Sequence, residues 1–196
     1  RVRSLITSVS SISNSSFQKV LYLVMIDGLS YYRFAEDRKK PGDRFVDFVN
    51  TYGNWPECGR VSLPQADALL SETPGADKVL LSAVSDRLAC WETDIEHELN
   101  EDPLPEELPD RTGILNDCQH GRLLWAFRNT FLHEFRHPVS AFHDDSKSNF
   151  PHYKIDLVEQ VRSGTNVWEL VIPAEFLKQL SLNCLHGLSA WLQSEG

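Results

Sequence analysis

Apolar residues recur every three or four positions through much of this chain, and this spacing predicts amphipathic α-helices. The clearest example is residues 17–34, where Leu21, Val24, Met25 and Leu29 share one helical face. The same spacing predicts further helices over residues 43–52, 63–72, 78–91 and 174–192. Residues 79–84 fit either a strand or a helix, and the spacing of Leu80, Val84 and Leu88 favours the helix. Ser16 precedes the helix of residues 17–34, and Asp43, Ser62 and Pro173 are the start signals of three of the others.

A different pattern appears in residues 153–172. Val, Ile, Tyr and Trp are frequent in residues 153–161 and 167–172, and residues 162–166 between them contain Gly164. β-Branched and aromatic runs around a glycine-containing turn are typical of a β-hairpin. An isolated hairpin is only marginally stable, so we expect this one to pack against the helices or a partner.

Three polar segments predict irregular structure. Residues 97–112 are acidic and rich in proline, and they predict a mobile surface loop. Residues 138–152 predict a second loop, in which His143 and His152 are solvated. The Ser-rich start fits either a short helix or a loose arm, and we expect residues 1–14 to be a flexible arm.

The length of 196 residues fits one domain, spanning residues 1–196. The expected fold is mainly α, an up-and-down bundle of four to five helices with one late β-hairpin. The net charge of −9 argues against a broad basic surface for non-specific nucleic-acid binding. No apolar run is long enough to span a membrane, and the four cysteines are far apart. We therefore expect a cytoplasmic protein with reduced thiols and no membrane partner.

One predicted helix carries two overlapping catalytic signatures. It begins at Thr112 or Asn116 and ends at His137, because Pro138 cannot continue it. Within it, RNTFLH reads as R-N-x-x-x-H, and HEFRH reads as H-E-x-x-H. Both signatures use His133, so choosing between them decides most of the predicted function.

Arg128 lies on the apolar face of this helix. Its neighbours on that face include Leu124, Phe131 and Leu132. A guanidinium in such a place must be paired or must reach a polar cleft. The structural interpretation is an ion pair with a carboxylate of a neighbouring helix, such as Asp27 or Glu36. The functional interpretation is an arginine that holds a phosphate.

The R-N-x-x-x-H string, late in a small helical domain, resembles the HEPN superfamily. The matching residues are Arg128, Asn129 and His133, and the resemblance covers residues 17–137. It implies a metal-independent endoribonuclease in which His133 transfers protons and Arg128 stabilises charge on the phosphate. Asn129 would orient the side chain of His133 or that of Arg128. Arg122 and Arg136 would be supporting phosphate contacts.

The resemblance also implies partners. RNA would be the substrate, members commonly form homodimers, and a toxin–antitoxin or defence setting would supply an antitoxin or another protein partner. No cofactor is expected. Many HEPN-like domains are non-catalytic, so a binding module in which Arg128 makes a structural ion pair is the alternative.

The second alternative is a zinc hydrolase. His133 and His137 would bind zinc, Glu134 would be the general base and Glu159 a third ligand. Against it, Arg136 places a positive charge between the two histidines, and Pro138 ends the helix at the second one. We therefore predict no metal site.

Overall fold

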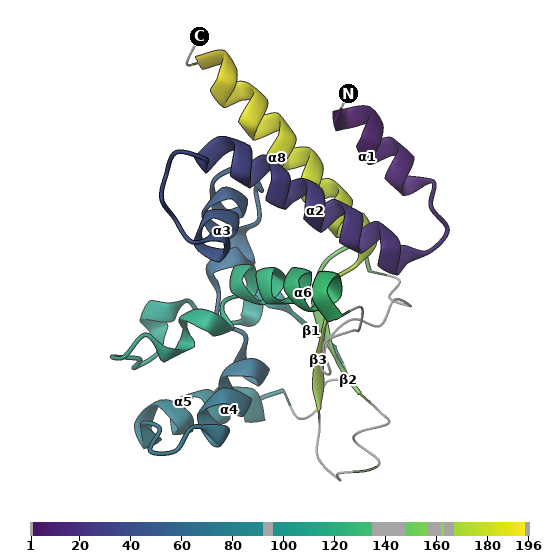
Figure 1. Cartoon of the computed structure of the whole chain (residues 1–196). Coiled ribbons are helices and arrows are strands. Elements are labelled where there is room, and N and C mark those ends of the chain that lie inside the picture. Colours follow the sequence, from purple (N-terminus) through teal and green to yellow (C-terminus); the bar gives the residue numbers. More distant parts are fainter. Residues whose placement is uncertain (1, 92–95, 135–147, 157–161, 163–166, 195–196) are drawn as a thin grey trace.

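The computed structural model describes residues 2–91, 96–134, 148–156, 162 and 167–194, with the side chains of residues 133 and 134 left out. This part of the chain is mainly helical, with a small three-stranded antiparallel sheet (Figure 1). The α-helices are α1 (Val2–Ser10), α2 (Ser15–Phe34), α3 (Pro41–Tyr52), α4 (Leu63–Glu72), α5 (Lys78–Ala89), α6 (His120–Glu134) and α8 (Ala174–Ser194). The strands are β1 (Glu96–Glu98), β2 (His152–Ile155) and β3 (Trp168–Val171). The short 3₁₀ helices are η1 (Pro56–Gly59), η2 (Leu99–Glu101), η3 (Pro105–Glu107) and η4 (Ile114–Cys118).

Helix α2 lies along α8, and both pack on α3, with α6 crossing beneath them (Figure 1). Helices α4 and α5 pair with each other at the opposite end of the molecule. The helices pack around one core, but the face predicted for α2 is only partly buried. Met25 and Leu29 pack against the core, whereas Leu21 and Val24 are exposed, and Tyr22, Leu23, Ile26 and Phe34 form the buried face. Fully buried members of that core are Leu23, Ile26, Phe45, Phe48, Val49, Leu177 and Cys184.

The described residues form seven α-helices, more than the four to five expected. One of the additional helices is α1, which the sequence left open as a helix or an arm. Its Ile6 and Val9 are buried against the α2–α8 pair. Burial of these two side chains fixes the segment, so the flexible-arm interpretation does not hold for residues 2–10.

Helices α2 and α3 each begin two residues before the predicted start. The N-cap of α2 is Asn14, not Ser16, because the Asn14 side chain accepts a hydrogen bond from the Phe17 backbone N–H. Helix α3 begins at Pro41, two residues before the predicted Asp43, because proline fits the first turn. Ser62 does precede α4, but its hydroxyl donates to the Gln65 side chain instead of capping the backbone.

The antiparallel strand pair of the predicted hairpin is confirmed, and a third strand joins it. The second half of the predicted first strand, residues 157–161, and the predicted turn, except Arg162, lie outside the described residues. Strands β2 and β3 pair antiparallel with His152 opposite Val171, and β1 adds to the free edge of β2 with His97 opposite Tyr153. Residues 97–112 are therefore not a loose loop, because they begin in β1 and continue through η2 and η3. His152, expected to be solvated, is buried in β2.

The predicted long helix is divided. Gly113 adopts a left-handed φ of 72° and precedes η4, and Gln119 is extended and bridges to Val61 before α6 begins at His120. A start at Thr112 or Asn116 is therefore wrong. The predicted end at His137 lies outside the described residues.

Helix α2 exposes an apolar stripe on its outer side, made by Phe17, Leu21, Val24 and Tyr31. No helix of the described residues is both long and apolar enough to cross a membrane. All four cysteines are free, and only Cys90 is exposed.

Candidate functional site

Arg128 lies where α6 meets α2, and its guanidinium has two partners there. Nη2 donates to Asp27 Oδ2 at 2.5 Å, and Nη1 donates to Asn129 Oδ1 at 2.9 Å. The guanidinium carbon is also 5.0 Å from the centre of the Trp125 ring. The Arg128 and Asp27 side chains are 17% and 18% exposed, so solvent screens this pair only in part.

The surrounding helix face explains why Arg128 needs a carboxylate. Leu124 and Phe127, which precede it by four residues and one residue, are buried. Of the two carboxylates considered from the sequence, Asp27 is the partner. The contact joins one nitrogen to one oxygen, since Arg128 Nε and Asp27 Oδ1 have no hydrogen-bond partner among the described residues. The pair is thus a single-point contact and not the two-bond fork that Arg and a carboxylate can form.

The structure brings together only some of the predicted site residues. Asn129 touches Arg128, and the backbone of His133 follows one turn later on α6. Arg122 lies apart from them and pairs with Asp43 on α3 at 2.5 Å. The proposed phosphate contact Arg136 lies outside the described residues.

The zinc signature cannot be assembled from the described side chains. Those of His133 and Glu134 are not described, and His137 and Glu159 lie outside the described residues. Among the residues that are described, no group of three His, Cys, Asp or Glu side chains could hold a metal ion.

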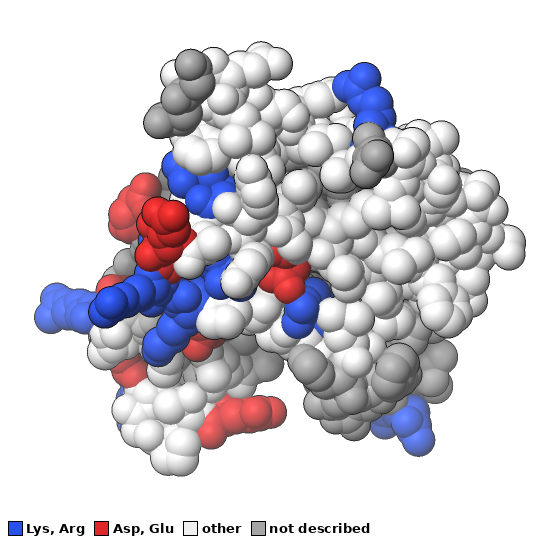
Figure 2. All heavy atoms as spheres, turned by 45° about the horizontal axis from the view of Figure 1, so that its top comes forward, with Lys and Arg blue, Asp and Glu red and all other residues white. Residues whose placement is uncertain are grey.

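Charge on the surface is mixed. Figure 2 shows Lys and Arg side chains gathered toward one side of the face, with Asp and Glu side chains between them, and a broad uncharged area elsewhere. The described side chains on this face therefore form no continuous basic surface, in keeping with the net charge of −9.

Sequence reasoning missed a second polar cluster, which is fully buried. His120, the first residue of α6, directs Nε2 at Asp102 Oδ2 (2.8 Å) and Nδ1 at the Glu57 carbonyl oxygen (2.8 Å). The Tyr153 hydroxyl donates to the same Asp102 oxygen at 2.7 Å. The exposed fraction of the Asp102, His120 and Tyr153 side chains is 0%. Arg60 also reaches this cluster and donates to the Asp102 carbonyl oxygen at 2.6 Å.

Hydrogen bonds join every member of this cluster. Both ring nitrogens of His120 lie at hydrogen-bond distance from oxygen atoms, and Nε2 is also 3.0 Å from the Tyr153 hydroxyl. Burial, reinforced by the charge of Asp102, raises the pKa of Tyr153 well above its usual range, so its hydroxyl stays a donor. Replacing only Asp102 or only His120 would be costly, because the remaining member would stay buried without its partner.

The cluster gives little signal in the sequence. Asp102 lies in a segment that reads as an acidic loop, and His120 and Tyr153 are 33 residues apart. Contacts between distant segments bring these residues together, among them the Val61–Gln119 bridge, the His120 N–H to Arg60 carbonyl hydrogen bond and the three-stranded sheet.

Comparison of the chain with protein-family models, with curated proteins and with solved structures gave no match.

Proposed function

We propose that this chain is a HEPN-like helical binding domain in which Arg128 is a structural residue. The up-and-down bundle expected for such a domain would consist of α2, α3, α6 and α8, with the sheet and the α4–α5 pair as additions. Its partner would be a protein, an antitoxin in a toxin–antitoxin setting, and the domain would form a homodimer.

The observation that supports this proposal is the Asp27–Arg128 contact. Asp27 supplies a full negative charge where a phosphate would have to bind. RNA would need to displace that carboxylate or tolerate its repulsion, in a chain that is already strongly acidic. A paired, mostly buried arginine fits the role of joining α6 to α2.

A double-mutant cycle tests the structural role of Arg128. Asp27→Leu and Arg128→Leu should each lower the free energy of unfolding by about 2 kcal/mol, because each leaves one charge partly buried and unpaired. The double variant should regain much of that loss, and denaturant unfolding measures all three. Additive losses, with no regain in the double variant, would contradict a structural pair.

The second candidate function is the metal-independent endoribonuclease. Two observations favour it: the Arg128–Asn129 contact groups two motif residues, and Arg128 Nε lacks a described partner. A guanidinium that gives one hydrogen bond to each of two partners keeps further N–H donors for a phosphate oxygen. His133 would then supply the proton transfer from the next turn of α6.

RNA cleavage in EDTA separates the two candidates. Under the binding-domain proposal the wild type gives no cleavage that depends on His133. Cleavage that persists in EDTA, and that disappears in both His133→Ala and Arg128→Lys, would establish the ribonuclease instead. Arg128→Lys keeps the charge opposite Asp27, so the fold is retained while the planar donor geometry is lost. Arg122→Lys is the matched control, since Arg122 pairs elsewhere.

The homodimer is tested separately by sedimentation. Leu21→Asp places a charge within the exposed stripe of α2, and it should shift a dimer toward monomer if that stripe is the contact. A wild type that sediments as a monomer at all concentrations would contradict the dimer.

A further inference from the structure

Two adjoining cavities open between the helical part and the sheet, and they share four lining residues. The volumes are about 360 and 570 Å³, and the shared residues are Trp55, Glu57, Phe150 and Phe176. Volumes of this size are typical of small-ligand sites. None of these four residues is a partner of Arg128, whose partners are Asp27, Asn129 and Trp125.

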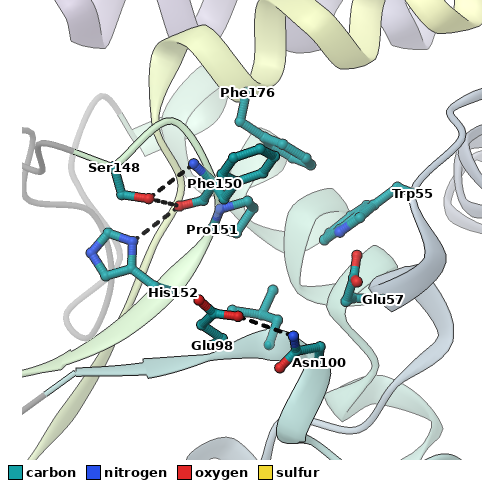
Figure 3. Close-up of a pocket in the computed structure, with 10 residues that line it drawn as sticks. Trp55, Glu57, Glu98, Asn100, Ser148, Phe150, Pro151, His152 and Phe176 are labelled. Carbon is teal, nitrogen blue, oxygen red and sulfur yellow. Dashed lines mark hydrogen bonds between the residues drawn. The ribbon is translucent and has the colours of Figure 1, made fainter.

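The walls of the shared region are aromatic. Trp55 and Phe176 meet edge to face with ring centres 5.1 Å apart. The Phe150 ring lies near them in Figure 3 and is 75% exposed. The exposed Phe150 ring offers its face to a ligand, and the largely buried Trp55 ring lines the same cavity. Aromatic ring faces attract cations.

The charged side chains of the two cavities are acidic. Glu57 and Glu98 lie below the rings in Figure 3, and Glu175 lines the second cavity. Glu175 is paired with Lys178, and Glu98 accepts a hydrogen bond from Asn100. The described lining residues include no lysine or arginine.

Glu57 is the carboxylate best placed for a ligand. Its side chain makes no hydrogen bond or ion pair with any described residue, and it lies beside the Trp55 ring. A cation resting on that ring would therefore also meet an unpaired negative charge.

The buried cluster described above holds this wall in place. Trp55 stacks on His120 with an interplanar angle of 16°, and Nδ1 of His120 donates to the Glu57 carbonyl oxygen. His120 is itself fixed by Asp102. The Trp55 ring and the backbone of Glu57 are thus held in place from behind before any ligand binds, which lowers the entropy cost of binding.

We propose that this cavity binds an organic cation, an alkylammonium or guanidinium group, between the Trp55 and Phe150 rings and beside Glu57. A free amine or the basic side chain of a peptide would supply the same chemistry. The inference is independent of the role of Arg128, so binding should be retained in Arg128→Lys.

Choline and its uncharged carbon isostere dimethylbutanol are the first probes. The indole N–H signal of Trp55, assigned with Trp55→Phe, should shift on titration with choline, with a dissociation constant on the order of 1 mM. The isostere has the same shape without the charge, so it should bind at least about tenfold more weakly. Equal binding of choline and the isostere would overturn the proposal, and so would the absence of saturation by choline and by the basic peptides named below.

Variants place the binding at this cavity. Glu57→Gln removes the charge and keeps the shape, and Phe150→Ala removes an exposed ring, so each should weaken choline binding by about fivefold or more. Glu72→Gln, on the exposed end of α4, is the matched control and should change nothing. An unchanged affinity in both cavity variants, with the fold intact by circular dichroism, would contradict the proposal.

Capped tripeptides Ala-Lys-Ala and Ala-Arg-Ala distinguish the sources of the cation. Tighter binding of a peptide than of choline assigns the cavity to a basic segment of a protein partner. Tighter binding of choline assigns it to a small free amine. Saturable binding of any of these cations that depends on Glu57 supports the proposal.

Discussion

Single polar side chains stabilise this fold where the backbone turns, and Asp110 is the clearest case. Burial opposes its charge, but backbone N–H groups of Leu115, Thr112 and Gly113 donate to the carboxylate, as does the Thr112 hydroxyl, so the pKa of Asp110 is lowered. A lowered pKa in the folded state means that this stabilisation is complete above the unfolded value of 3.8. It is lost as the pH falls through the folded pKa.

Asp110→Asn tests this pH dependence. At pH 7 the variant should unfold at a lower temperature than the wild type, because the amide turns a donor toward the Leu115 N–H. Below the folded pKa the wild-type carboxyl is also uncharged, so the difference in Tm should shrink. Thermal melts at pH 7 and at successively lower pH values below 3.8 measure it, and a difference that grows in acid would show that the charge is not the cause.

Tyr153 offers a second test at a single side chain. Tyr153→Phe keeps the ring but removes the hydroxyl that donates to Asp102, so the free energy of unfolding should fall by about 1–3 kcal/mol. Tyr32→Phe is the control, because Tyr32 is 62% exposed and should change stability by no more than about 0.5 kcal/mol. Urea unfolding compares the two, and equal losses would mean that the buried hydroxyl is not special.

The helices show how far the sequence alone reaches. Apolar spacing predicted α2, α4, α5 and α8 nearly to their ends, because each buries one regular face. It failed at α6, since Gln119 leaves the helical path to bridge to Val61, a partner 58 residues away in the chain. Strand β1 is only three residues long, too short for an alternating pattern to be read.

The candidate sites divide in the same way. The anomaly at Arg128 was visible as a charge on an apolar face, and Asp27 was one of the two partners considered. The Asp102–His120 pair was not visible in the sequence, because its members come from separate segments that only the folded chain joins. A charge on the apolar face of one helix can be recognised from the spacing of nearby residues, whereas a buried pair between distant segments leaves no such local pattern.

Two glycines within helices should respond in opposite directions to replacement by alanine. Gly28 lies on the open side of α2 with nothing within 4 Å of an added Cβ, so Gly28→Ala should stabilise the fold by about 0.5–1 kcal/mol. In Gly121, on α6, the added Cβ would be 2.6 Å from Cys58 Sγ, which is fully buried. Gly121→Ala should therefore destabilise by about 1–3 kcal/mol. Thermal unfolding of both variants decides, and a stabilising Gly121→Ala would mean that α6 does not approach η1 this closely.

The four cysteines of the chain differ in their exposure to solvent. Cys90 is exposed, whereas burial raises the pKa of Cys58 to about 12 and that of Cys118 to about 11 and also raises the pKa of Cys184. A thiol reagent at pH 8 should therefore modify one cysteine per chain quickly. The count of fast thiols should fall to zero in Cys90→Ser, and two or more fast thiols in the wild type would contradict the core described here.

The three slow thiols have a practical consequence, because each of them sits in a different element. Cys58 lies in η1, Cys118 in η4 and Cys184 in α8. A reagent can reach them only when those elements separate from the core, so each of the three labelling rates reports how often its own element unfolds locally. Identical rates would mean that the helices and the elements beside the sheet come apart in one concerted event. If Cys118 were labelled ahead of Cys184, the chain would instead begin to open at η4, while the long C-terminal helix was still in place.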